Sequence, residues 1–102
     1  MNSNERILSA LGFAMKAGKV RSGEFAAERA LKSGKALAAV LDEGASENAR
    51  KHWSDKCGSA GVPLVIAGGV GKAIGKASHN IACITDKGFA EMILRDPNGK
   101  LS

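Results

Sequence analysis

The spacing of apolar residues predicts five helices. Apolar residues three and four positions apart form one face of a helix. Residues 4–17 keep this spacing, and Gly18 follows them, where a left-handed glycine often ends a helix. Spacing together with flanking glycines and capping residues predicts four more helices, over 24–33, 46–60, 70–74 and 85–95. The expected inward faces of the third and fifth helices include Ala60 and Met92.

Three uninterrupted apolar runs have the length of strands. They occupy residues 37–41 (LAAVL), 64–67 (LVIA) and 81–84 (IACI). Such runs are typical of strands covered on both faces. A shorter extended segment, 20–22, precedes the second helix. The alternation of strands and helices predicts an α/β protein with a mainly parallel sheet between helical layers.

The length of the chain, 102 residues, is that of one domain. We expect a single domain over residues 1–96 and a C-terminal tail over 97–102, because Asp-Pro-Asn-Gly forms a turn after the last helix. Hydrophobic residues make up 44% of the chain and aromatic residues only 4%. The core must therefore be built from alanine, valine, isoleucine and leucine.

The charge balance suggests a polyanionic partner. There are 15 lysines and arginines against 10 acidic residues, a net charge of +5, and the pI is near 9.5. Many soluble proteins are as basic without binding nucleic acid, so composition alone leaves the partner open. Cys57 and Cys83 fit no paired metal-ligand spacing. No secretion signal or membrane span is recognisable, so we expect a cytoplasmic protein that does not bind membranes.

The most informative stretch is 19–34, KVRSGEFAAERALKSG, in which a short strand, a glycine and a helix follow one another. The unpaired amides that open a helix carry partial positive charge and attract phosphate. Basic residues lie on both sides of the glycine. The candidate RNA-binding residues of this junction are Lys19, Arg21, Ser22, Gly23, Glu24, Phe25, Arg29 and Lys32.

The segment 68–76, GGVGKAIGK, resembles a phosphate-binding loop only superficially. Neither Gly-Lys pair has the earlier glycine, or the following serine or threonine, that a Walker A motif requires, and the dinucleotide pattern also fails. The segment is either a glycine-rich turn around a short helix or a second contact with RNA backbone. The candidate RNA-binding residues of this second region are Lys72, Lys76, Ser78 and His79.

Phe25 has two interpretations. It is either a stacking platform for an unpaired base or an ordinary core residue folded back onto the edge of the sheet. Catalysis is not indicated, because no nucleophile, histidine and carboxylate converge in the sequence. We therefore expect no enzymatic activity, no cofactor and no metal.

Several sequence blocks together resemble a known superfamily. They lie in one order between residues 5 and 94: KAGKVRSGE, LKSGKA, ASENARK, DKCGSAGVP, GKAIGK and ITDKGFA. Their order is similar to that of the kink-turn-binding ribosomal protein superfamily, which includes ribosomal proteins L-seven-Ae and L-thirty-e, and above all to its bacterial YlxQ-type members. The resemblance implies a three-layer α/β/α sandwich with a four-stranded mixed sheet, and non-catalytic binding of structured RNA.

The resemblance is incomplete where that superfamily reads its RNA. Kink-turn binders follow the junction glycine with Thr-Asn-Glu and, three residues later, a lysine. Here Gly23 and the positive charge of Arg29 match, but Phe25 and Ala26 replace the asparagine and glutamate. We expect binding to a kink-turn-like or otherwise bent or looped RNA, with ribosomal or translation-associated proteins as further partners and a monomer when free. The alternatives are a protein-interaction adaptor on the same scaffold and the substrate-binding part of an RNA-modifying system.

Overall fold

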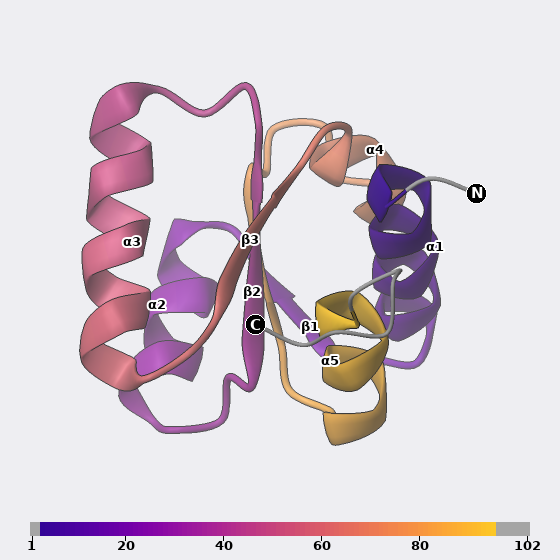
Figure 1. The fold of residues 1–102 in the computed structure, drawn as a ribbon, viewed down its shortest axis with the longest axis horizontal. Coiled ribbons are helices and arrows are strands. Elements are labelled where there is room, and N and C mark those ends of the chain that lie inside the picture. Colours follow the sequence, from indigo (N-terminus) through magenta and orange to yellow (C-terminus); the bar gives the residue numbers. More distant parts are fainter. Residues whose placement is uncertain (1–2, 96–102) are drawn as a thin grey trace.

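The computed structural model describes residues 3–95 and contains five helices and four strands within that range (Figure 1). The elements in chain order are α1 (Ser3–Lys16), β1 (Val20–Ser22), α2 (Glu24–Lys32), β2 (Ala38–Asp42), α3 (Glu47–Ala60), β3 (Leu64–Ala67), α4 (Val70–Ile74), β4 (Ile81–Ile84) and α5 (Lys87–Leu94). All nine predicted elements are present, and no end differs from its predicted position by more than two residues. The predicted tail, 97–102, lies outside the described residues.

The four strands form one mixed sheet in the order β1-β4-β2-β3. Only β2 and β3 pair in parallel, and β4 runs antiparallel to both β1 and β2. The expectation of a mainly parallel sheet is therefore wrong. The cause is the shortness of α4, whose five residues span about 7.5 Å and cannot return the chain along the strands. The chain re-enters the sheet at the same end of the strands at which β3 finished, so β4 runs in the direction opposite to β3.

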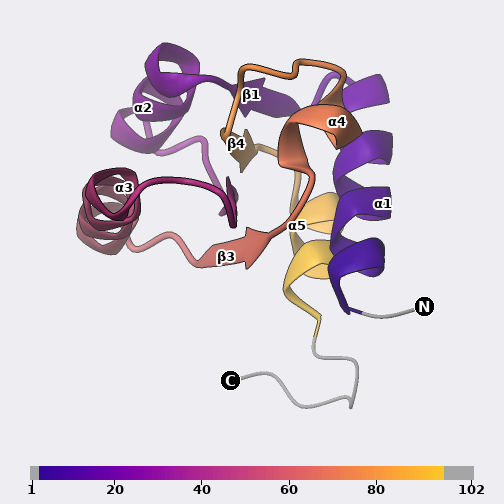
Figure 2. The same cartoon turned by 90° about the horizontal axis from the view of Figure 1, so that it is seen from above.

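Helices cover both faces of the sheet. Helices α2 and α3 lie on one face, and α1, α4 and α5 lie on the other, as Figures 1 and 2 show. Alternate residues of the central strands point into the two cores: Val40 joins the core under α1, and Leu41 joins the core under α2 and α3. The architecture is the three-layer α/β/α sandwich that the family resemblance implied.

Strand β3 is less buried than its apolar sequence suggests. It pairs with β2 alone, at the edge of the sheet, and Ile66 is 44% exposed. The prediction of a strand covered on both faces is wrong here, whereas it is confirmed for β4, of which every residue is buried. Two residues expected to face inward, Ala60 and Met92, are also exposed. Ala60 lies beyond the stripe of α3 that ends at Cys57, and Met92 lies beside the buried stripe of α5, which continues from Ala90 to Ile93.

Side chains cap three helices at their amino ends. Ser46 Oγ accepts a hydrogen bond from the amide of Ala49 (3.1 Å), and Asp86 Oδ2 accepts one from Phe89 (3.0 Å). The sequence predicts Ser46 as the cap of α3 and either Thr85 or Asp86 as the cap of α5, and in the structure Asp86 is the cap. Helix α4 is capped from another element. Asp42, the last residue of β2, accepts hydrogen bonds from the amides of Gly69 and Val70, both at 2.9 Å. This carboxylate fixes the start of α4 relative to the sheet.

Removal of the Asp42 carboxylate tests whether its hydrogen bonds to Gly69 and Val70 anchor the start of α4. The hydrogen bond from Val70 contributes most to holding the pKa of Asp42 below its ordinary value of 3.8, with those from Gly44 and Gly69 adding to it and burial opposing it. A lowered pKa adds stability that is complete above about pH 4 and is lost as pH falls through the folded-state value. We expect Asp42→Ala to cost about 1 kcal/mol at pH 7, by analogy with lost helix caps, and less below pH 3. Urea denaturation at both pH values measures this.

The matched control is Asp55→Ala, because Asp55 is an exposed residue of α3. Its loss should change stability little at either pH. If the two variants unfolded at the same urea concentration at pH 7, Asp42 would not anchor α4.

Candidate functional site

Gly23 joins β1 to α2 in a conformation that strongly favours glycine, with φ +86° and ψ 159°. Its amide donates a hydrogen bond to the carbonyl of Ile81 in β4 (3.0 Å), and its carbonyl accepts one from Ala27 (3.0 Å), which begins α2. No side chain of the N-cap covers the first amides of α2. The junction therefore has the geometry expected of an anion-binding helix start.

His79 connects the second predicted region to this junction. A hydrogen bond of 2.9 Å joins its Nδ1 to Ser22 Oγ. Its ring also covers Gly23, since a Cβ built on that glycine would lie 3.1 Å from His79 Cε1. The two candidate regions, 57 residues apart in sequence at the Ser22–His79 pair, thus form one surface.

The loop that carries His79, residues 75–80, packs tightly on α4. A Cβ added to Gly71 would lie 2.9 Å from the carbonyl oxygen of Lys76, 3.0 Å from that of Ala77 and 3.1 Å from that of His79. The glycines of this segment therefore serve close packing and the two ends of α4, where Gly69 and Gly75 adopt left-handed conformations. This geometry explains why the segment is rich in glycine without being a nucleotide-binding loop.

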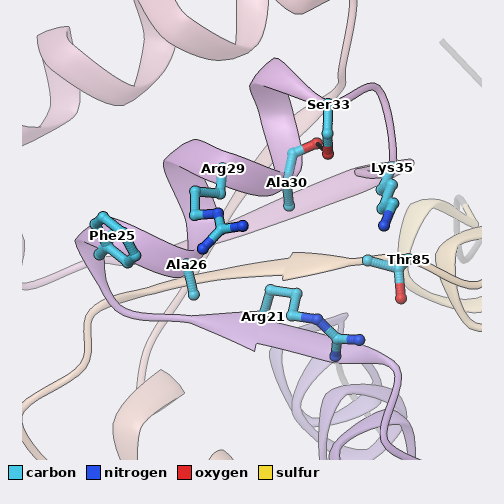
Figure 3. Close-up of a pocket in the computed structure, with 8 residues that line it drawn as sticks. All are labelled: Arg21, Phe25, Ala26, Arg29, Ala30, Ser33, Lys35 and Thr85. Carbon is cyan, nitrogen blue, oxygen red and sulfur yellow. Dashed lines mark hydrogen bonds between the residues drawn. The ribbon is translucent and has the colours of Figure 1, made fainter.

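A groove of about 300 Å³ runs along α2 beside β1 and the end of β4. Figure 3 shows Phe25 and Arg29 at one end and Lys35 with Thr85 at the other. Arg21 lies between them, on β1. Its Nη1 donates to the carbonyls of Gly18 (3.1 Å) and Val20 (3.0 Å), which holds the guanidinium at the wall of the groove. Three cations thus line one concave surface.

Phe25 is 74% exposed, and the Arg29 guanidinium carbon lies 5.6 Å from the centre of its ring. The core interpretation of Phe25 is therefore wrong. The inward positions of α2 belong to Ala27, Ala30 and Leu31, all buried, and Phe25 falls on the outer side of the first turn. A large apolar ring held in solvent beside an arginine is the arrangement that stacking on a flat ligand requires.

The remaining predicted residues are spread over the surface around the junction. Lys72 and His79 line one open pocket near the start of α4, of about 610 Å³, while Lys76 and Ser78 are exposed in the adjoining loop. Lys19 is exposed and its carbonyl accepts hydrogen bonds from the amide (2.9 Å) and hydroxyl (3.2 Å) of Thr85. Glu24 is exposed in the first turn of α2.

Lys32 lies apart from this surface. It lines a different pocket, together with Lys56 and Ser59, between α2 and α3. Glu28 Oε1 forms an ion pair with Lys56 Nζ (3.4 Å) and lies 3.8 Å from Nε2 of His52. The spacing of Arg29 and Lys32 in the sequence did not reveal that the two line different pockets.

Lys35 and Thr85, at the far end of the groove, are among its residues that are absent from the sequence-based prediction. Lys35 follows the glycine that ends the junction segment and belongs to the same run of basic residues, so charge alone could have suggested it. Thr85 gives no such signal, because it reaches the groove only through the pairing of β4 with β1.

The two cysteines and the arrangement of the titratable groups indicate no metal centre within the described residues. Cys57 and Cys83 are free and buried, and burial, with a smaller effect of Cys57, raises the pKa of Cys83 to about 12. Within residues 3–95 no group of three or more histidines, cysteines and acids is arranged to hold a metal ion. In the same range, every helix is too short or too polar to cross a membrane.

Comparisons with known proteins identify the family. No family model matches the chain. The RNA-binding protein YlxQ of Bacillus subtilis (strain 168) is 34% identical over 87 residues, which cover 82% of this chain and 87% of that protein. A solved structure of a protein with unknown function from Bacillus halodurans matches with a TM-score of 0.80 and 31% identity, covering 86% of this chain and 92% of the other.

A more distant structure has the same fold. The 15.5 kD RNA-binding protein of Giardia lamblia matches with a TM-score of 0.74 at 18% identity, over 89% of this chain and 81% of its own. The identity and coverage of the Bacillus subtilis protein extend the likeness from fold to family. The chain belongs to the YlxQ family.

Proposed function

We propose that the protein binds structured RNA, without catalysis, through the surface formed by the β1–α2 junction and the α4–β4 loop. The observation that carries the proposal is the contact of His79 with Ser22 and Gly23, which joins the two regions. The name of the Bacillus subtilis relative, an RNA-binding protein, supports it. The net charge of +5 favours a polyanion as well.

In this mechanism the phosphate backbone is held from two sides. The first amides of α2 donate hydrogen bonds to a phosphate, and Lys19, Arg21 and Arg29 neutralise its neighbours. Lys72 and Lys76 hold the strand on the other side of His79. Two contact regions that meet at His79 suit an RNA that bends or loops, which includes a kink-turn.

Recognition of the bases differs from that expected of kink-turn binders. Those proteins place asparagine and glutamate after the junction glycine, where this chain has Phe25 and Ala26. An alanine has no hydrogen-bonding side chain, and a phenylalanine recognises any base by stacking. We therefore propose that RNA shape, more than base sequence, selects the target, and that ribosomal or translation-associated ribonucleoproteins in the cytoplasm are its setting.

The salt dependence of binding tests the proposed contacts of the first amides of α2 and the surrounding basic residues with RNA phosphates, which we call the phosphate grip. The probe is an RNA hairpin whose stem carries a three-nucleotide bulge, and an uninterrupted hairpin of equal length is the comparison. If four or five phosphates are neutralised, the affinity for the bulged hairpin falls about a hundredfold between 50 and 200 mM salt. Fluorescence anisotropy measures it. A flat salt response, or equal affinity for both hairpins, would overturn the proposal.

Reversal of the charge at Arg29 tests the position of the surface. Arg29→Glu should lower the affinity for the bulged hairpin more than tenfold, because it removes a phosphate contact and repels the strand. Lys51→Glu is the control, since Lys51 is an exposed residue of α3, and it should cost less than threefold at 150 mM salt. Equal losses would mean that the RNA lies elsewhere.

A further inference from the structure

The groove between β1 and α2 continues along α2 beyond the residues that we propose to contact RNA phosphates, as far as Lys35 and Thr85. Its far end, at Lys35 and Thr85, lies beyond the carboxyl end of α2, whereas the junction and the His79 loop meet at the amino end (Figure 3). We infer that this groove takes one unpaired nucleotide of the RNA, with its base stacked on Phe25 and its phosphate between Arg21 and Lys35. The inference rests on the proposed function and assigns a separate subsite within it.

The stacking end is built from Phe25 and Arg29. The ring is 74% exposed, and the guanidinium of Arg29 lies 5.6 Å from its centre, within the range of a cation–π contact. That contact restrains the ring from one side and leaves most of its surface open. A base placed on the open face removes apolar surface of both partners from water, and this stabilisation does not depend on which base is bound.

The phosphate end is built from Arg21 and Lys35. Arg21 is held in place by the carbonyls of Gly18 and Val20 through Nη1 alone, one of its three nitrogens, so it keeps donors for phosphate oxygens. Lys35 faces the same groove from the chain that follows α2. Among the described residues that line the groove, none is acidic. An anion therefore meets only attraction there.

The size and lining of the groove favour a nucleotide over other ligands. About 300 Å³ corresponds to the smaller ligand sites of proteins. The walls are basic, and the only large apolar surface is one aromatic ring at one end. A purely apolar ligand would leave the cations unused, and an acidic peptide would leave the ring unused. An unpaired nucleotide, with a flat base at one end and a phosphate at the other, uses both.

The experiment uses a single-stranded RNA of five adenosines in which the central base is 2-aminopurine, whose fluorescence falls when it stacks. We expect the protein to quench this fluorescence at 50 mM salt. Phe25→Ala should weaken binding about tenfold and remove the quenching, while Phe25→Tyr keeps both. Arg21→Ala should weaken binding severalfold but leave the quenching at saturation unchanged. Because Phe25 is largely exposed, its replacement leaves the fold intact, which circular dichroism can check.

Phe13→Ala is the matched control, since Phe13 is also an exposed phenylalanine, 58% accessible, but lies on α1. Equal effects of the Phe13 and Phe25 variants would overturn the inference. So would a pentaglutamate peptide that binds as tightly as the RNA and is insensitive to Phe25→Ala, because the groove would then be a plain electrostatic surface.

Different experimental results would disprove the nucleotide subsite and the proposed function. If the bulged hairpin binds with the expected salt dependence but the pentanucleotide shows no quenching, the stacking subsite is wrong and the phosphate grip stands. If the pentanucleotide is quenched through Phe25 but the bulged hairpin binds no better than the uninterrupted one, the preference for bent RNA is wrong.

Discussion

Gly71→Ala is expected to destabilise the protein by about 2 kcal/mol and to weaken RNA binding, although alanine is the better helix former. Helix propensity alone would give a gain of about 1 kcal/mol. The added methyl group would, however, lie within 2.9–3.1 Å of three backbone carbonyl oxygens, those of Lys76, Ala77 and His79. Overpacking against backbone costs about 1–3 kcal/mol, and no side-chain rotation can relieve it. The loop must move away from α4.

Displacement of the loop should also be visible in RNA binding. Because the loop carries Lys76 and His79, its movement should lower the slope of log affinity against log salt by about one phosphate contact. Urea denaturation and a salt titration with the bulged hairpin measure the two effects. Gly58→Ala is the control: Gly58 is also helical, and nothing lies within 4 Å of an added Cβ. That variant should gain about 0.5–1 kcal/mol. If Gly71→Ala were equally stabilising, the close packing of the loop would be disproved.

Gly23→Ala is the second variant with a large expected effect. At φ +86° and ψ 159°, alanine is strained by about 1–3 kcal/mol, and its methyl group would also meet the ring of His79 at 3.1 Å. We expect a loss of about 2–3 kcal/mol of stability. We also expect weaker RNA binding, because relief of the strain turns the first amides of α2 away from the phosphate. Thermal unfolding and anisotropy with the bulged hairpin measure both.

A double-mutant cycle separates the two causes. His79→Ala removes the ring that the new methyl group would meet but leaves the backbone strain. Gly23→Ala should therefore cost less stability in the His79→Ala background than in the natural chain. An identical cost in both backgrounds would show that strain alone is responsible and that the packing of His79 on Gly23 contributes nothing.

The fold could be predicted from local patterns wherever a single segment determines its own structure. The cap at Ser46 and the buried run of β4 are of this kind, and both are confirmed. For α5 the sequence left Thr85 and Asp86 as alternative caps, of which the structure uses Asp86. The direction of β4 and the exposure of β3 could not be predicted in this way, because both depend on which strands become neighbours. An apolar run such as 64–67 has the same sequence pattern in a central strand and in an edge strand. The exposure of Ile66 therefore became known only from the three-dimensional structure.

For the candidate site, too, some residues could be predicted from local motifs and others depend on the tertiary structure. Gly23 and the basic residues around it follow from a local motif, and the structure gives that glycine the conformation that the motif requires. Arg29 and Lys32 look equivalent in sequence, and residues three apart are neighbours on a helix, yet Lys32 lines the pocket that it shares with Lys56 of α3. Thr85 enters the groove only through the register of β1 with β4, and the ring of His79 reaches Gly23 from the far end of the chain.

The pairing of β1 has a consequence for the order of events during synthesis. Within the described sheet, β1 is hydrogen-bonded to β4 alone, and Gly23 donates to Ile81 at the start of that strand. Residues 20–23 therefore leave the ribosome early but have no partner until some sixty residues later, when 79–84 have emerged. The surface that we propose for RNA is completed only when β4, the last strand of the described sheet, has been made. A nascent chain thus cannot engage RNA in its native mode until nearly all of its core is available.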